Sequence, residues 1–251
     1  MKLKAFICDV LAREAYYWAS GSQHVIDIEL LSSDEHHDYP KKGHDVLQNK
    51  IDALDASRNK YDYILLGFGL CGKMLGELKS RNIPMVAPRV HDCIALFLGS
   101  NKAYNKHCVD HAGTLCYIDA WLERSPARLE KNELQSIGFN SNFEEYVEKY
   151  GEEGAEYLTE IANSWKKTYA QCLYVKNKSV NKDFSAAIKA QAAERNWQYQ
   201  EVEGNSILIK KLMLGEWCDE EFLIIDSHSI ITQDSEPRER IIRAGKQSKE
   251  I

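Results

Sequence analysis

Short apolar runs alternate with amphipathic stretches along the first half of the chain. The runs have the length and the β-branched content of buried strands, which we expect at residues 4–8, 25–31, 63–66, 85–87 and 114–118. Helical spacing and composition predict helices between them, at residues 10–20, around 47–54, from 72 to about 80 and at 94–98. Strands that alternate with helices indicate an α/β fold with a parallel, doubly wound sheet.

The last third of the chain repeats this order. Strands are expected at residues 173–175, 199–202 and 222–225, with helices between them. We therefore expect two Rossmann-like halves with parallel sheets, related by an internal duplication and joined by a helical segment. The expected parts are an N-terminal half (1–119), a helical connector (120–168), a C-terminal half (169–235) and a charged tail that projects outward (236–251).

Composition and charge narrow the class of protein. The chain has 251 residues, of which 44% are apolar and 28% charged, and its net charge is -6. This balance is typical of a globular protein and argues against a general nucleic-acid binder. The longest apolar runs are too short to span a bilayer, and the N-terminus lacks the apolar core of a signal peptide. We expect a cytoplasmic protein without a membrane partner.

Three of the seven cysteines follow strands of the first half. Cys8 ends the first strand, Cys71 lies in the turn after the third, and Cys93 comes just after the fourth. In the common strand order 2-1-3-4-5, these strands are neighbours about 4.8 Å apart, and their carboxyl ends share one edge of the sheet. The count is odd and no CxxC occurs, so reduced thiols are expected rather than a disulfide framework. The sequence therefore predicts that three thiols converge on one centre.

Three thiolates suit a soft or borderline metal. Zinc would take them with His91 or water as a fourth ligand, whereas a [4Fe–4S] cluster would take three and leave one iron open. The absence of a strong fourth ligand favours the cluster slightly. Two alternatives stay open, namely that each cysteine is a small buried hydrophobe or that one is a redox or nucleophilic thiol.

The turn before the helix expected from residue 72 is rich in glycine. Gly67, Gly69 and Gly72 match the spacing of a dinucleotide fingerprint, with Asp92 about 20 residues further on. The fingerprint belongs after the first strand of such a unit, and here it follows the third. The glycines are explained more simply by a close approach of the backbone to the group that Cys71 holds.

His91, Asp92 and Cys93 bring three ionisable groups to one strand end. His91 is a candidate ligand or general acid–base, alone or paired with Cys93, and we expect His91 and Asp92 to be the catalytic residues. The alternative is that Asp92 caps the following helix and His91 lies on the surface. Arg13 and Arg89 are candidate cations for an anionic ligand, with ordinary ion pairs as the alternative.

Two further segments carry candidate chemistry. Residues 33–38 are rich in histidine and carboxylates, which in an acidic loop are usually solvated. Trp217 is interpreted as a core contact rather than a ligand platform.

Several segments together resemble a known family. They are Cys-Asp-Val-Leu-x-Arg-Glu at residues 8–14, Gly-Phe-Gly-Leu-Cys-Gly at 67–72, Pro-Arg-x-His-Asp-Cys-x-x-x-x-Leu-Gly-Ser at 88–100, Gly113-Thr114, Trp121 and Tyr-Gly-x-x-x-Ala-x-Tyr-Leu at 150–158. Over roughly residues 3–230 the chain is similar to an uncharacterised family, a domain of unknown function found mostly in methanogens, acetogens and other anaerobes. The cysteines that match Cys8, Cys71 and Cys93 belong to that family's signature, whereas Cys116 stands where an aromatic residue is expected.

The resemblance implies an anaerobic setting, often beside corrinoid methyl-transfer systems. It favours a metal- or iron–sulfur-dependent protein of one-carbon metabolism, with a small anionic substrate or a corrinoid protein as partner. The competing interpretation is an accessory or small-ligand-binding protein in which the cysteines are structural. A metal-free two-thiol racemase ranks low, because Ser227 and His228 stand where the second half would need a thiol.

Overall fold

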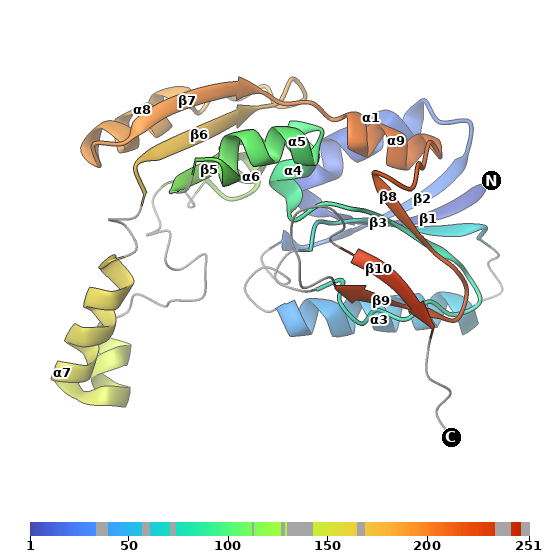
Figure 1. Cartoon of the computed structure of the whole chain (residues 1–251), viewed down its shortest axis with the longest axis horizontal. Coiled ribbons are helices and arrows are strands. Elements are labelled where there is room, and N and C mark those ends of the chain that lie inside the picture. The colour runs from blue at the N-terminus through green and yellow to red at the C-terminus, as the bar shows by residue number, and fades with distance from the viewer. Residues whose placement is uncertain are drawn as a thin grey trace. The chain divides into compact units, whose positions relative to one another are not determined.

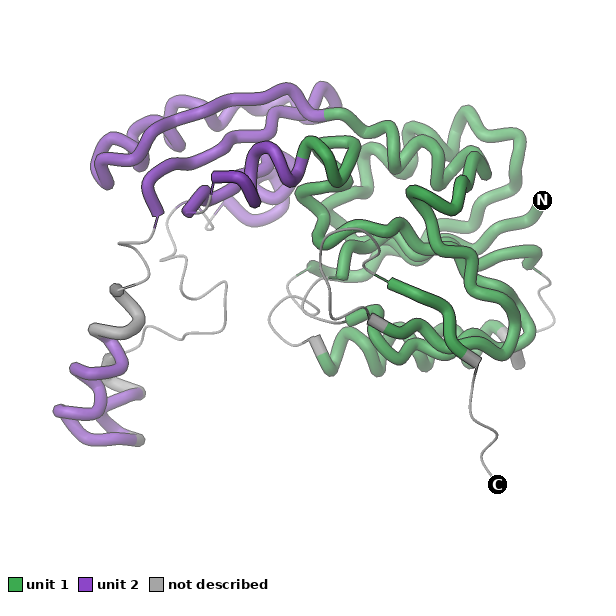
Figure 2. The backbone as a smooth tube through the Cα atoms, in the orientation of Figure 1, with its two compact units in different colours: residues 1–103, 205–251 green, residues 104–204 purple. Residues whose placement is uncertain are grey.

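The computed structural model describes residues 1–33, 40–56, 61–70, 74–111, 113–126, 129, 143–164, 169–233 and 242–246. The chain forms two compact units, one of residues 1–103 with 205–251 and one of residues 104–204 (Figure 2). Each unit has its own sheet with parallel strands and helices between them, so the expected α/β class is confirmed.

Five strands form the sheet of the first unit. Their order is β2 (Val25–Leu31), β1 (Lys2–Cys8), β3 (Tyr63–Gly67), β4 (Met85–Pro88) and β8 (Phe222–Ile225) (Figure 1). The first four are parallel and stand in the expected order 2-1-3-4, while β8 is antiparallel to β4. Every residue of β4 is buried, and so are the last four of β3, because both strands lie inside the sheet with helices nearby.

Helices lie on both sides of this sheet (Figure 1). On one side, α1 (Ala12–Ser20) packs against α9 (Ile207–Leu214), which buries Leu208 and Leu212. On the other side is α3 (Pro40–Ala56), whose Leu47 and Ile51 are buried. The short helix α4 (Cys93–Leu98) follows β4.

The second unit is built on a three-stranded parallel sheet. Its order is β5 (Thr114–Ile118), β6 (Gln171–Lys176) and β7 (Gln198–Glu203). Between β6 and β7 lies α8 (Ser185–Glu194), which buries Ile188 and Ala192. Among the described residues, this unit also contains the π-helical turn η3 (Asn105–Val109), α6 (Asp119–Arg124) and α7 (Phe143–Ser164). The short helix α5 (Asn101–Tyr104) belongs to the first unit except for its last residue.

The two units differ from the division expected at residues 119 and 168. β5 pairs with β6 rather than with the first sheet, and β8 leaves the expected second half to pair with β4. In the first sheet β1 lies between β2 and β3, whereas the second sheet follows chain order. The strands of the expected C-terminal half therefore do not form one sheet, and the internal duplication is not confirmed.

Two local predictions were wrong. The helix expected up to about Ser80 is replaced, over the described residues, by a turn at 74–77 in which Glu77 has a φ of 66°. The backbone of this segment is hydrogen-bonded to β9 (Ser229–Gln233) instead. The Glu77 amide donates to the Ile231 carbonyl (2.8 Å), and the Ile231 amide donates to the Leu78 carbonyl (2.9 Å). The C-terminal tail was expected to project outward, yet its residues Ile242–Lys246 form β10, antiparallel to β9 (Ser229–Gln233), with Ile242 buried.

Candidate functional site

The carboxyl ends of three parallel strands meet at one edge of the first sheet. β1 ends at Cys8, β3 at Gly67 and β4 at Pro88, and β3 lies between the other two. Ligands of open α/β sheets bind beyond this edge, near the place where the strand order reverses. Here that place is between β1 and β3.

Cys8 is held at the start of a short 3-10 turn. Its side chain is buried, and its thiol lies 4.0 Å from the Asp9 carboxylate. The same carboxylate oxygen accepts the Ser33 amide (3.0 Å), which ties the turn to the end of β2. The backbone on both sides of Cys8 is therefore fixed by neighbouring strands.

The loop after β3 lies directly against the start of α4. A Cβ atom at Gly69 would overlap the backbone of Asp92 and come within 2.9 Å of the Cys93 amide nitrogen. The Leu70 amide also donates to the His91 carbonyl (3.0 Å). The backbone at Gly69 thus packs closely against the segment that carries Cys93. The expected approach to a group held by Cys71 stays a prediction.

Asp92 caps α4 from the extended conformation that N-cap residues adopt. Its Oδ1 accepts the amides of Ile94 (2.9 Å) and Ala95 (3.4 Å). Its Oδ2 lies 3.2 Å from Nδ1 of His91, whose side chain is 56% exposed. The capping alternative describes this geometry, and a part for either residue in proton transfer stays a prediction.

Only two of the three cysteines of the predicted site are among the residues that the structure describes. Cys8 and Cys93 are buried thiols at the same sheet edge, whereas Cys71 and Gly72 lie outside the described residues. Among the residues that the structure describes, no group of three His, Cys, Asp or Glu side chains could hold a metal ion. The convergence of Cys8, Cys71 and Cys93 therefore stays a prediction.

Arg89 anchors the C-terminal strands rather than facing a ligand. It is 5% exposed, and its guanidinium donates to the carbonyls of Asp219, Phe222 and Ile242. It also forms an ion pair with the Asp219 carboxylate (2.9 Å). The other candidate cation, Arg13, lies exposed on α1.

The two remaining candidates are Trp217 and the loop of residues 33–38. Trp217 donates to the Leu212 carbonyl (2.9 Å), and its ring centroid lies 5.0 Å from that of Tyr63, which agrees with a core contact. Of the loop 33–38, only Ser33 is among the described residues.

A second polar edge occurs in the second unit, and the sequence analysis missed it. Asp119, Asn177 and Gly204 follow β5, β6 and β7 directly, at the carboxyl edge of that sheet. Asp119 is fully buried and accepts the backbone amide and the side-chain amide of Asn177. Burial raises the pKa of Asp119, although the bonds from Asn177 and Ala120 oppose this. The rule that ligands bind at strand ends would have found this edge if β5 had been assigned to the second sheet.

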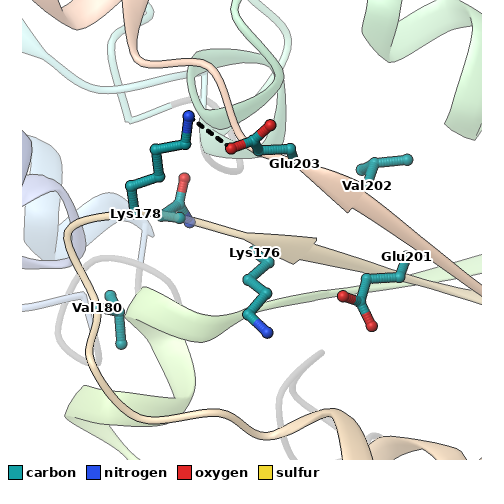
Figure 3. Close-up of a pocket in the computed structure, with 7 residues that line it drawn as sticks. Lys176, Lys178, Val180, Glu201, Val202 and Glu203 are labelled. Atoms are coloured by element: carbon teal, nitrogen blue, oxygen red, sulfur yellow. Dashed lines mark ion pairs between the residues drawn. The ribbon is translucent and has the colours of Figure 1, made fainter.

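A cavity of about 400 Å³ opens beside this second edge (Figure 3). Its polar lining comes from Asn177 and from oppositely charged side chains of β6, β7 and the turn after β6, namely Lys176, Lys178, Glu201 and Glu203. Lys178 forms an ion pair with Glu203 (2.7 Å), and Lys176 pairs with Asp183 (2.7 Å). The Lys176 ammonium holds the pKa of Asp183 well below its usual range. The lysines that line the cavity are therefore already paired with carboxylates of the same unit.

These features define an α/β protein whose first unit places two buried thiols, Cys8 and Cys93, and the glycines Gly67 and Gly69 at one sheet edge. The chain belongs to a family described as proteins of unknown function, DUF1638, whose model matches residues 32–213. The match includes Cys71 and Cys93 and begins after Cys8. No curated protein and no solved structure matches the chain. Over the described residues, no helix has the length and apolar character needed to cross a membrane.

Proposed function

We propose that Cys8, Cys71 and Cys93 bind a metal centre at the carboxyl edge of the first sheet, in a protein of anaerobic one-carbon metabolism. The observation that carries this proposal is the contact between the two loops beyond β3 and β4. Leu70, the residue before Cys71, is hydrogen-bonded to His91, two residues before Cys93. The loop that leads into Cys71 is therefore fastened to the segment that carries the third thiol.

Strand spacing supports the inclusion of Cys8. The register places Ile7 opposite Gly67, so Cys8 is one residue beyond the last β1–β3 pair. Gly67 has no side chain to separate the strands, and a Cβ there would overlap the Ile7 side chain. Because adjacent strands are about 4.8 Å apart, side chains from β1 and from the loop after β3 can share one metal centre.

The donor set fits two kinds of centre. Three thiolates with His91 would hold zinc, and the contact of its Nδ1 with Asp92 is the kind of hydrogen bond that orients a histidine ligand. Three thiolates alone would hold a [4Fe–4S] cluster with one open iron. We favour the cluster slightly, because the His91 side chain is more than half exposed.

Methyl transfer is the reaction class that we propose for this centre. A thiolate-bound metal supplies Lewis acidity, which lowers the pKa of an acceptor bound to it. The chain's own part would be to hold the acceptor at the sheet edge and to keep the thiolates buried. The family resemblance motivates a corrinoid protein or a small anionic substrate as partner.

Purification without oxygen tests the proposal. A brown protein that absorbs near 400 nm and contains iron and sulfide would establish the cluster, whereas a colourless protein with one zinc per chain would establish zinc. Protein that contains neither metal, after expression with both supplied, would refute a metal centre.

The second candidate is a small-ligand-binding protein in which the cysteines are structural. The cavity beside Asn177 favours it, because it is lined by paired charges at a strand edge where ligands bind. Under this alternative, Cys71→Ser would lower stability and leave activity intact. Under the first proposal, the same change would remove the metal and largely preserve the fold.

A further inference from the structure

Two thiols of the second unit are in direct contact. The Sγ atoms of Cys108, on η3, and Cys116, on β5, lie 3.2 Å apart. We propose that Cys108 and Cys116 form a reversible disulfide and are a redox modification site of this protein. The proposal is independent of the metal centre, because it concerns different cysteines in the other unit.

The backbone holds both cysteines in place. Cys108 lies within a five-residue π-helical turn, which the Asp110 amide closes by donating to the Asn105 carbonyl (2.8 Å). Cys116 is fixed by the pairing of β5 with β6, in which it stands opposite Leu173. A π-turn is uncommon and often marks a functional position. The proximity of the two sulfurs therefore results from two ordered elements.

Residues between the cysteines strengthen this arrangement. Gly113 adopts a φ of 84°, which favours glycine, and its carbonyl accepts the Ala170 amide (3.0 Å). Thr114 donates through its hydroxyl to the His111 carbonyl (2.6 Å). These contacts order the segment around both cysteines. Because an S–S bond is about 2.05 Å long, the two sulfurs would have to approach by only about 1.2 Å from their present separation of 3.2 Å.

The pair also has suitable access to solvent. Cys108 and Cys116 are both half-buried, whereas Cys172 is buried and Cys218 is exposed. A half-buried thiol can react with a small disulfide, yet it is poorly placed for a bond to a second protein chain. The expected product is thus an intrachain bond rather than a dimer.

The oxidant is a low-molecular-weight disulfide such as oxidised glutathione. One protein thiolate attacks it, which forms a mixed disulfide and releases one small thiolate. The second protein thiolate then attacks the mixed disulfide at the protein sulfur and releases the other. The two protein thiols lose two protons and two electrons in total, and one small disulfide is reduced to two small thiols.

The test equilibrates the full chain in buffers of oxidised and reduced glutathione, blocks remaining thiols, and maps the products by mass spectrometry. Trypsin leaves Cys108 and Cys116 as the two cysteines of one peptide, residues 107–124, and cleavage before Asp110 separates them. We expect this peptide to be lighter by two hydrogen atoms and to escape alkylation, and its two parts to stay joined after cleavage before Asp110. The bond should disappear when excess reduced glutathione is restored.

Serine variants give the matched controls. Cys108→Ser and Cys116→Ser should each leave a mixed disulfide with glutathione on the other cysteine, because the second step is lost. Cys172→Ser, on the neighbouring strand, should leave the linked peptide unchanged. Stable mixed disulfides on the native pair, alkylation of both thiols at every ratio, or linkage of either cysteine to another would overturn the proposal.

Discussion

The backbone of Gly69 lies against the backbone of Asp92, with no room for a side chain between them. This contact joins the loop after β3 to the residue that begins α4, at the edge where Cys8 ends β1. Packing alone therefore requires glycine at position 69, and this glycine is explained without a bound dinucleotide.

Gly69→Ala should therefore be destabilising. The added methyl group would push the loop away from Asp92 and Cys93, at a cost of about 1–3 kcal/mol, as for other overpacked sites. Urea unfolding measures this change, and the metal content should fall in parallel because the loop carries Cys71. Gly21→Ala is the control, since a Cβ there would lie 4.0 Å from its nearest neighbour, the Trp18 carbonyl. Equal stability of the two variants would contradict the packing described at Gly69.

Asp92 is expected to stabilise the fold by capping the N-terminus of α4. Asp92→Ala should cost about 1 kcal/mol, because the Ile94 and Ala95 amides lose their acceptor. Asp92→Ser, which retains a capping oxygen, should restore most of the stability and the metal content. If the serine variant folds like the native chain and yet loses activity in an assay of methyl transfer, Asp92 has a chemical role beyond capping.

Arg89 should matter for stability rather than for an anionic ligand. Arg89→Met keeps a long side chain but removes the guanidinium that donates to the carbonyls of Phe222 and Ile242, which should cost about 2–4 kcal/mol. Hydrogen exchange should show that β10 loses protection first. Arg13→Met, at an exposed position of α1, should lower stability much less, and equal effects at Arg13 and Arg89 would contradict the anchoring role of Arg89.

Asp52 provides a prediction about pH. Arg81 donates to both of its carboxylate oxygens, at 2.8 and 3.1 Å, and this pairing holds the pKa of Asp52 below its usual value. Since the pKa is lower in the folded chain, the stabilisation is complete above the unfolded value of about 3.9 and is lost as pH falls through the folded value. Carbon-13 titration of the Asp52 carboxyl should give a higher midpoint in Arg81→Gln, whereas Arg124→Gln should leave it unchanged. An unaltered midpoint in Arg81→Gln would show that the pair does not persist in solution.

The central part of the first sheet could be predicted from the sequence. The runs at β1, β2, β3 and β4 are short, apolar and separated by helical segments, and the common strand order for such a pattern is the observed one. The alternation of apolar runs and helical segments does not determine which sheet a strand belongs to. β5 and β8 were therefore assigned to the wrong neighbours, because their partners β6 and β4 are chosen by tertiary packing.

Polar segments were the other source of error. Ile242 lies in a tail rich in charged residues, and it is buried where β10 pairs with β9 and where the distant Arg89 guanidinium donates to its carbonyl. The helix expected before Ser80 has acceptable composition, but the amides of Glu77 and Ser80 donate to carbonyls of β9 instead. One local feature of the site was predicted correctly. Capping of α4 by Asp92 was one of the two interpretations that the sequence allowed, and the structure shows it.

Metal content of single cysteine variants tests the central claim most directly. Oxygen-free preparations of the native chain, Cys8→Ser, Cys71→Ser, Cys93→Ser and Cys218→Ser would be compared for bound iron and zinc per folded chain, with circular dichroism to confirm folding. Cys218 is an exposed thiol that donates to Glu221 in the first unit, so its variant is the control. We predict that the first three variants lose the metal and that Cys218→Ser retains it. A native chain without metal, or folded Cys8, Cys71 and Cys93 variants that keep it, would contradict the three-thiol centre.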